Sequence, residues 1–268
     1  MKAISLHSVV PVRTEAREGA EQSTQMLFGE LCTILEKKPR WNRIKLDSDG
    51  QEGWVDEKMI ASIGGKDYAA YKKAYASAAM VVFPMAYAMS ENNGQTIPLT
   101  AGTKLTNYNV QTANGASVAR FEVLGVGFRI DPSMVRTQPS ELNLQTLLET
   151  TRFFINVPYL WGGKNALGMD CSGFTQVVMS LFGKHLLRNA SEQATQGRAV
   201  ADLKKAKAGD LVFFDHEDGK ISHVGIVIDS ERIIHCSGRV KVEKLDSNGI
   251  FSAEFGQYTH HLVSIRRV

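Results

Sequence analysis

Three residues in the second half of the chain have the types and the order that nucleophilic catalysis requires: Cys171, His223 and His235. Cys171 lies in Asp170-Cys171-Ser172-Gly173, where a loop pattern changes to a helical one. The thiolate is the nucleophilic form of cysteine, and a free thiol has a pKa of about 8.5. A helix N-terminus favours the thiolate through its partial positive charge. This position predicts a nucleophile, although a buried cysteine that only packs is the usual case.

The neighbours of Cys171 suggest contacts with a substrate. Gly173 has no side chain, so we expect it to let a substrate approach closely. Asp170 opposes activation, because a nearby carboxylate raises the pKa of a thiol. It is therefore predicted to have another role, such as binding a cationic group of the substrate.

The two histidines flank a predicted β-hairpin. His223 opens the strand Val224–Ile228, His235 follows the strand Arg232–Ile234, and Asp229-Ser230 begins the turn. Residues directly opposite in a hairpin have Cβ atoms about 5 Å apart, and diagonal ones about 7–8 Å apart. One imidazole would then hold the other in a single tautomer, as the third group of a Cys–His pair does. Either histidine alone is more simply a polar strand-end residue, but the two together favour catalysis.

A zinc site is the competing interpretation of Cys171, His223 and His235. The ligand types are suitable, but the short ligand spacing of structural zinc sites is missing. Three cysteines without a C-x-x-C pair also argue against a disulfide framework. We expect no metal or organic cofactor and assign Cys32 and Cys236 to packing. The histidines that fit no constellation, and are expected at the surface or in the core, are His7, His185, His216, His260 and His261.

Two predicted helices position the nucleophile. Ser140 is a candidate cap for a helix whose apolar residues recur at helical spacing up to Phe154, and Pro158 is expected to end it. A second helix begins near Cys171 and has Gly183 as a plausible stop. From Gly209 onward the pattern changes to strands. Helices followed by an antiparallel sheet predict an α+β domain. The candidate strands are Leu211–Phe214, Val224–Ile228, Arg232–Ile234 and Leu262–Ile265.

The first half of the chain has the pattern of small β-barrels. Short strands and tight turns such as Ser48-Asp49-Gly50 fill residues 27–60. A second such stretch covers residues 80–136, with turn signals at Asn92-Asn93-Gly94, Ala101-Gly102 and Asn114-Gly115. Pro132 and Pro139 mark a linker. The predicted domains are residues 1–64, 65–137 and 138–268.

Composition excludes several classes of protein. The chain has 268 residues, of which 43% are hydrophobic, and a net charge of +3 from 31 basic and 28 acidic residues. This balance gives no footprint for a nucleic-acid partner. The stretch Ala74–Ser90 is at the short limit for a membrane span, so we expect no span. Met1–Ala20 lacks a signal-peptide pattern, so we expect a cytoplasmic protein unless a leader has been removed.

The motifs around these residues resemble the NlpC/p60 family of bacterial cysteine peptidases. The resemblance covers about Ser140 to Val268 and implies a papain-like fold. Gly53-Trp54-Val55, with Trp41 upstream, resembles a bacterial SH3-like domain. Two such domains ahead of the catalytic one resemble the γ-D-glutamyl-L-diamino acid endopeptidases. The motifs that carry the family resemblance are Pro158–Gly163, Asp170–Phe174, Gly209–Phe214, Ser222–Ile226 and Ile234–Gly238.

The resemblance implies a role for each matching residue. Cys171 matches the nucleophile, His223 the general base and His235 the polar third residue. Tyr159 matches a tyrosine that lines the site and assists the oxyanion. The residues that the resemblance places against the substrate are Asp170, Ser172, Ser191, Trp161 and, from the first barrel, Glu30. One position departs from the pattern: Asn189 stands where these endopeptidases usually carry an aspartate that suits a free amine.

The expected reaction is hydrolysis of the bond between γ-D-Glu and a diamino acid, meso-diaminopimelate or L-Lys. The expected substrates are short peptidoglycan-derived peptides with a free N-terminal L-Ala. Two alternatives remain open. One is a transferase of the same fold that passes its acyl group to an amine or a lipid, and the other is a non-catalytic wall-binding protein.

Overall fold

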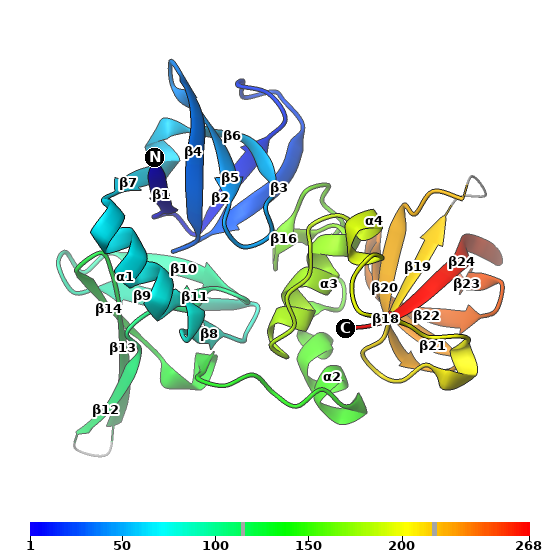
Figure 1. Ribbon diagram of the computed structural model, residues 1–268. Helices are drawn as coiled ribbons and strands as arrows, with labels where there is room; N and C mark the ends of the chain where they lie inside the picture. The colour runs from blue at the N-terminus through cyan, green and yellow to red at the C-terminus, as the bar shows by residue number, and fades with distance from the viewer. Residues whose placement is uncertain (114–115, 216–218) are drawn as a thin grey trace. The chain divides into compact units, whose positions relative to one another are not determined.

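The computed structural model describes residues 1–113, 116–215 and 219–268 (Figure 1). The described residues divide into two compact units, Met1–Gln138 and Pro139–Val268, and each is treated by itself. The turn signal at Asn114-Gly115 and His216 lie outside the described residues.

The first sheet of the N-terminal unit has the strand order β3-β2-β6-β5-β4-β1-β7. Buried and exposed residues alternate from Asn42 to Leu46, because successive side chains of a strand point to opposite faces of the sheet. The turn after Leu46 contains Gly50 at φ 76°, a conformation that favours glycine. The elements are β1 (Lys2–Ser5), β2 (Val9–Arg13), β3 (Gln22–Leu27), β4 (Leu31–Lys38), β5 (Trp41–Leu46), β6 (Glu52–Asp56), η1 (Glu57–Met59) and β7 (Ile60–Ile63).

A second group of strands packs against the first within the same unit. Phe28 packs edge-on against Phe128, with ring centroids 5.5 Å apart, in a core that combines residues of both groups. This shared core makes the unit one compact body. Its elements are β8 (Ala79–Val81), β9 (Met85–Ser90), β10 (Thr96–Thr100), β11 (Lys104–Leu105), β12 (Asn109–Ala113), β13 (Ala116–Val123), β14 (Val126–Ile130), η2 (Pro132–Met134) and β15 (Val135–Arg136).

Helix α1 (Gly65–Ala76) joins the two groups of strands and was not predicted from the sequence. Tyr68 and Tyr71 are its buried residues, and the Tyr71 hydroxyl donates a hydrogen bond to the Gly29 carbonyl at 3.2 Å. The uncharged stretch Ala74–Ser90 forms the end of α1, then β8 and β9. None of the described helices is both long and apolar enough to cross a membrane.

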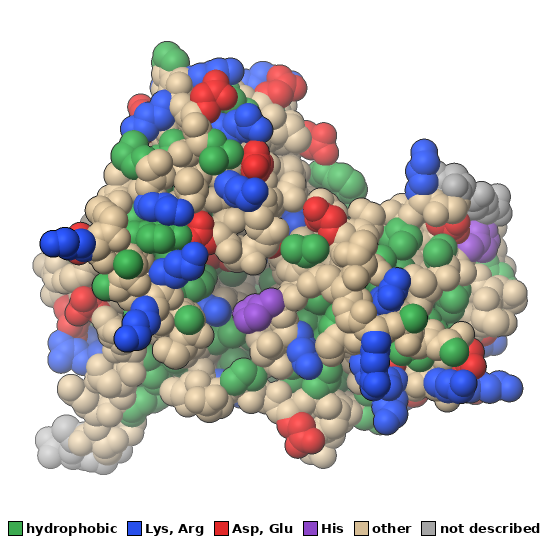
Figure 2. Space-filling view, viewed as in Figure 1, with side chains coloured by type: hydrophobic (Ala, Val, Ile, Leu, Met, Phe, Trp, Pro, Cys, Tyr) green, Lys and Arg blue, Asp and Glu red, His purple; other side chains and the backbone are tan. Residues whose placement is uncertain are grey.

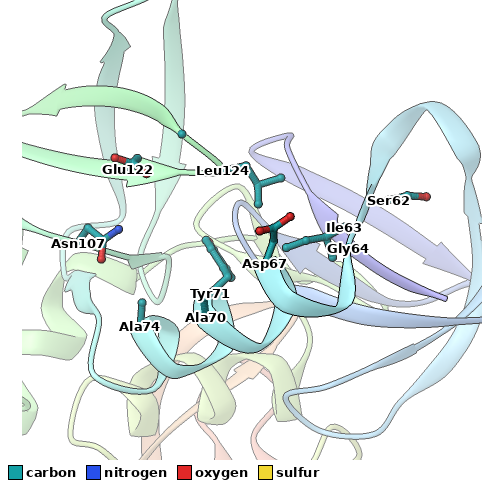
Figure 3. A pocket seen from close by; sticks show the side chains of 11 residues that line it. Ser62, Ile63, Gly64, Asp67, Ala70, Tyr71, Ala74, Asn107, Glu122 and Leu124 are labelled. Atoms are coloured by element: carbon teal, nitrogen blue, oxygen red, sulfur yellow. The ribbon is translucent and has the colours of Figure 1, made fainter.

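A cavity of about 590 Å³ lies beside α1 (Figure 3). Asp67 and Tyr71 line it from the helix, and Asn107, Glu122 and Leu124 line it from the second group of strands. All of its lining residues belong to the N-terminal unit.

The C-terminal unit begins with helices, as predicted. The first is capped by Asn143 rather than Ser140, because the Asn143 side chain accepts the Thr146 N–H at 3.0 Å. The helix from Cys171 ends before Gly183, which has φ 72°. The elements before the barrel are α2 (Leu144–Thr151), η3 (Arg152–Phe154), β16 (Lys164–Asn165), β17 (Gly168–Met169), α3 (Cys171–Ser180), α4 (Ala190–Gln193), β18 (Arg198–Ala199) and η4 (Leu203–Lys205).

The predicted antiparallel sheet is a closed barrel. Its order is β19-β20-β21-β22-β23-β24, and β24 pairs with both β23 and β19. Two strands, β22 and β23, were missed. His235 does not end its strand as expected, since β21 continues to Ser237. The barrel strands are β19 (Leu211–Asp215), β20 (His223–Asp229), β21 (Arg232–Ser237), β22 (Arg239–Asp246), β23 (Gly249–Ser252) and β24 (Gln257–Arg267).

Helices α2, α3 and α4 lie on one side of this barrel, with α3 packed against β20 (Figure 1). Helix α3 is almost wholly buried, so it acts as the core of the unit rather than as a surface helix. Phe174 on α3 packs edge-on against Phe154, with ring centroids 6.3 Å apart. This contact holds α3 against η3, while the packing of α3 on β20 places the helix that carries Cys171 beside the strand that carries His223.

Charged side chains of both signs are intermixed on the face shown in Figure 2. Lys and Arg side chains lie beside Asp and Glu side chains over both units, with hydrophobic side chains between them. An intermixed surface of this kind is typical of a solvated protein face.

Gly173 serves the packing of α3, not the approach of a substrate. A Cβ atom at this position would overlap the backbone carbonyl oxygen of Gly163. The same carbonyl accepts the Asp170 N–H at 3.1 Å, so the loop before the helix lies directly on its first turn. The expectation that Gly173 opens the site to substrate is therefore replaced by a close backbone contact.

We predict that Gly173→Ala destabilises the protein by about 1–3 kcal/mol, the usual cost of overpacking a tight contact. Urea unfolding would measure the change. Gly65→Ala is the matched control. Gly65 also lies in the first turn of a helix, but a Cβ atom added there would have no neighbouring atom within 4 Å. Equal effects of the two substitutions would contradict the packing role of Gly173.

Candidate active site

Cys171 is the first residue of α3, and its side chain lies against the start of β20. Asp170 caps the helix by accepting the Gly173 N–H at 2.7 Å. The Cys171 sulfur receives hydrogen bonds from the backbone N–H groups of Ser172 and Val224. Because Val224 directly follows His223, the structure brings the cysteine and the first histidine to the same place.

The thiol of Cys171 is neutral at rest. Burial is the largest cause that raises its pKa, to about 11, and the charge of Asp170 raises it further. The N–H groups of Val224 and Ser172 and the charge of Arg188 act in the opposite direction but do not compensate. The helix N-terminus predicted to favour the thiolate is present, yet burial outweighs it. A base must therefore take the proton during the reaction.

His223 and His235 are joined by a direct hydrogen bond of 2.8 Å between Nε2 and Nδ1. The strand register pairs Gly225 with His235, so the two histidines lie on a diagonal, one of the two arrangements expected from the hairpin. Both are buried, and their rings are nearly perpendicular. His235 thus restrains the orientation of the His223 ring.

Glu243 is a member of the cluster that sequence reasoning missed. Its Oε2 lies 2.9 Å from Nε2 of His235 and 3.2 Å from Nζ of Lys241. Burial raises the pKa of Glu243, but the hydrogen bond from His235, the proximity of Ser252 and the nearby positive charges outweigh it and lower the pKa to about 2. The sequence signal that could have revealed this strand is the alternation of Val240 and Val242 with charged residues along β22.

His260 also belongs to this cluster, contrary to the expectation that it fits no constellation. Its ring is 4.2 Å from that of His223 and 5.9 Å from that of His235, centroid to centroid. Phe214 lies against both His223 and His260. No sequence pattern indicates this contact, because β24 reaches the histidines only through closure of the barrel.

Asp170 has a cation within the chain itself. Arg188, with 1% of its side chain exposed, donates to both carboxylate oxygens of Asp170 at 3.0 and 2.6 Å. It also donates to the Ser172 hydroxyl at 2.9 Å, and the Gly162 N–H donates to Asp170 at 2.9 Å. Asp170 and Ser172 thus belong to a buried group of polar contacts that positions the first turn of α3, and their contact with a substrate stays a prediction.

Tyr159 lies half-buried on the loop that precedes Cys171. Its N–H donates to the Gly238 carbonyl at 2.9 Å, and an isolated bridge pairs it with Met169. Burial raises the pKa of its hydroxyl, and the nearby Cys171 raises it further. The hydroxyl is therefore protonated near the thiol and able to donate a hydrogen bond, which fits the oxyanion role implied by the resemblance.

The other predicted substrate residues lie in different surroundings. Trp161, 60% exposed, stands at the surface next to the Tyr159 loop, and Ser191 is exposed on α4 with Asn189 just before it. Glu30 belongs to the N-terminal unit, where its buried carboxylate accepts the Leu27 N–H at 2.9 Å. The roles of these residues toward a substrate stay predictions.

The competing zinc interpretation finds no arrangement to support it. Within residues 1–113, 116–215 and 219–268, no three His, Cys, Asp or Glu side chains are grouped so as to hold a metal ion. His223 and His235 instead bond to each other through Nε2 and Nδ1.

Comparison with known proteins agrees with this geometry. Residues 156–259 match the NlpC/P60 family, and residues 12–60 match the bacterial dipeptidyl-peptidase Sh3 domain. A γ-D-glutamyl-L-lysine dipeptidyl-peptidase of Bacillus subtilis (strain 168) is 29% identical over 222 residues, which is 79% of this chain and 71% of that protein. One of Bacillus cereus (strain ATCC 10987 / NRS 248) is 26% identical over 230 residues, covering 79% of this chain and 66% of that protein.

Solved structures share the fold. The crystal structure of an NlpC/P60 family protein from Bacillus cereus ATCC 10987 aligns with a TM-score of 0.82 at 19% identity, covering 100% of this chain and 99% of that one. An NlpC/P60 endopeptidase from Photobacterium damselae subsp. piscicida aligns with a TM-score of 0.69 at 15% identity, covering 98% and 70%.

The chain is a cysteine peptidase that carries an NlpC/P60 domain, residues 156–259, in its C-terminal unit. The N-terminal unit contains an SH3-like domain of the type found in bacterial dipeptidyl-peptidases. The predicted fold class is thereby confirmed: a papain-like α+β domain preceded by an SH3-like region.

We predict that Asp170→Asn and Arg188→Met each destabilise the protein by about 3–5 kcal/mol, because each leaves a buried group without its charged partner. The double variant should recover part of this loss, since it removes both charges. Urea unfolding of the three variants and the wild type completes the cycle. Strictly additive losses would show that the pair is not a unit.

Acid should destabilise the histidine cluster. Burial lowers the pKa of His235 below its usual 6.5, and the pKa of Glu243 is lowered from 4.5 to about 2. The unfolded chain therefore binds more protons, and stability falls as pH drops below 6.5 and further below 4.5. Urea unfolding between pH 7 and pH 4 should show a shallower loss for His235→Gln than for the wild type. An equal fall in the free energy of unfolding with pH for both proteins would contradict the lowered pKa of His235.

Proposed function

We propose that this peptidase hydrolyses the bond between γ-D-Glu and a diamino acid in short peptides derived from peptidoglycan. One observation supports the proposal most strongly. The Cys171 side chain, at the first residue of α3, lies against the start of β20, the strand that begins with His223. Nε2 of His223 is in turn hydrogen-bonded to Nδ1 of His235 at 2.8 Å. The names of the two Bacillus relatives supply the bond type, since both are γ-D-glutamyl-L-lysine dipeptidyl-peptidases.

The reaction begins with proton transfer from the Cys171 thiol to His223 as the sulfur attacks the γ-carbonyl carbon. The carbonyl oxygen becomes an oxyanion, which the backbone N–H of Cys171 and the protonated Tyr159 hydroxyl are oriented to stabilise. The C–N bond then breaks, and His223 returns the proton to the leaving amine. Water, deprotonated by His223, hydrolyses the thioester and releases the peptide acid and the free thiol.

We also propose that the substrate carries a free N-terminal L-Ala. The proposal rests on the resemblance to the γ-D-glutamyl-L-diamino acid endopeptidases and on the dipeptidyl-peptidase type of the SH3-like domain. Glu30 is the candidate partner for the amine, and Asn189 makes no charge contribution where related enzymes usually have an aspartate. Trp161 and Ser191 are the candidate contacts of the peptidase unit with the substrate.

The test is release of L-Ala-γ-D-Glu from L-Ala-γ-D-Glu-meso-diaminopimelate and from its L-Lys counterpart, followed by mass spectrometry. The wild type should release the dipeptide, and Cys171→Ala should release none, because the thioester cannot form. Cys32→Ala is the matched control, since Cys32 is also a buried free cysteine but lies in the N-terminal unit. N-acetylated substrates should resist cleavage if the free amine is required.

The possible outcomes separate the alternatives. Cleavage of the acetylated peptides would keep the chemistry but overturn the free-amine requirement. Transfer of the dipeptide to an added amine in preference to water would identify an acyltransferase. Absence of both products with the wild type would overturn the proposed reaction.

A further inference from the structure

The end of the barrel holds a chain of polar contacts that extends beyond His235. His223 Nε2 lies 2.8 Å from His235 Nδ1, and His235 Nε2 lies 2.9 Å from Glu243 Oε2. Lys241 Nζ follows at 3.2 Å from the same oxygen. The side chain of His235 has no exposed surface, and that of Glu243 is 8% exposed, so water is largely excluded from these contacts.

We propose that Glu243 is a positioning residue, which fixes His235 and through it His223 in the tautomers that leave Nδ1 of His223 as the base toward Cys171. The catalytic consequence rests on the proposed function. The placement of protons on the two rings does not, and it is testable without a substrate.

The argument follows from the donors and acceptors along the chain of contacts. An ionised carboxylate only accepts hydrogen bonds, so Nε2 of His235 must carry a proton. A neutral His235 then has no proton on Nδ1, which accepts. Nε2 of His223 must consequently donate in the 2.8 Å bond. A neutral His223 with its proton on Nε2 has a lone pair on Nδ1, the nitrogen that can remove the thiol proton.

This arrangement of protons on the two imidazoles exists only while His235 is neutral and Glu243 is ionised. Burial lowers the pKa of His235, while Glu243 acts in the raising direction and Lys241 in the lowering direction. Lys241 lies 3.2 Å from Glu243, and its side chain is only 11% exposed, so its charge stabilises the carboxylate even when His235 is uncharged. Within the part of the chain that the structure describes, titratable groups near the two imidazoles also include His260, whose ring is tilted against that of His223, and the Cys171 thiol.

A protonated His235 would reverse the arrangement. Its Nδ1 would donate to Nε2 of His223, which would then have to accept. The proton of a neutral His223 would move to Nδ1, and the base toward Cys171 would be lost. Glu243 and Lys241 thus favour one of two proton arrangements of the same geometry.

The experiment compares Glu243→Gln, His235→Gln and the double variant with the wild type. Glu254→Gln is the matched control, because Glu254 also pairs with Lys241, at 3.4 Å, but lies exposed at the surface, where its other partner is Arg239. The readouts are the nitrogen-15 shifts of the imidazoles, the pH profile of Cys171 alkylation by iodoacetamide, and kcat/KM on the muropeptide. Alkylation is located by mass spectrometry, with Cys171→Ala as the blank.

We expect both wild-type rings to carry the proton on Nε2 at neutral pH. In Glu243→Gln the amide can donate as well as accept, so a mixture of tautomers should appear. Alkylation and kcat/KM should fall by about 10- to 100-fold, part of the 10²–10⁴-fold that a general base typically contributes. In the His235→Gln variant, Glu243→Gln should cause no further loss of alkylation rate or kcat/KM. Glu254→Gln should have the alkylation rate and kcat/KM of the wild type.

Three results would overturn the proposal. The first is that Glu243→Gln leaves the imidazole tautomers unchanged. The others are that Glu243→Gln lowers kcat/KM as much in the His235→Gln variant as in the wild type, or that Glu254→Gln lowers kcat/KM as much as Glu243→Gln does. If Glu243→Gln does not fold, Lys241→Met replaces it. Because the charge of Lys241 lowers the pKa of His235, Lys241→Met should shift the acid side of the pH profile of Cys171 alkylation to higher pH. An unchanged pH profile would contradict the proposed role of Glu243. A wild type that cleaves no muropeptide but shows the expected tautomers would overturn the proposed function and leave this inference standing.

Discussion

The buried carboxylate of Asp170 is the contact on which the geometry around the nucleophile depends. It caps α3 through the Gly173 N–H, binds the Gly162 N–H of the preceding loop, and pairs with Arg188. Three separate segments of the chain therefore meet at one side chain. Because an isolated charge is costly to bury, the carboxylate is stable there only with these partners in place, which makes the arrangement cooperative.

This arrangement has a chemical cost. The charge of Asp170 and the burial of the helix start raise the pKa of the Cys171 thiol, whereas the helix end and Arg188 lower it less. These effects favour the neutral thiol, so its activation requires a nearby base. The barrel places His223, the proposed base, on β20 and its hydrogen-bond partner His235 on β21, both within one closed sheet.

Local sequence patterns predicted the parts of the fold that local forces determine. The helix from Cys171 and the strand that starts at His223 both have a clear periodicity and recognisable ends. Helix α1 was missed although its tyrosines recur at helical spacing, because charged residues between them obscure the apolar face. The cap of α2 fell on Asn143, since a cap depends on which side chain reaches the N–H three residues on.

The contacts that sequence reasoning missed are long-range ones. Glu243 meets His235 because β21 and β22 pair in one register, and a shift of a single residue would turn Glu243 to the other face of the sheet. Arg188 meets Asp170 across 18 positions of the chain. His260 meets His223 through closure of the barrel by β24. No local periodicity records such pairings.

Two carboxylates near the proposed active site, Asp170 and Glu243, act on Cys171 in opposite ways. Asp170 opposes the thiolate by its charge but holds the helix that positions it. Glu243 is two hydrogen bonds removed from His223, so its effect on the thiol passes through proton positions rather than through direct charge. Each has its own buried cation, Arg188 or Lys241, which limits the field that either carboxylate exerts on the other. The site thus separates two tasks, holding the helix and orienting the base, between two independently neutralised ion pairs.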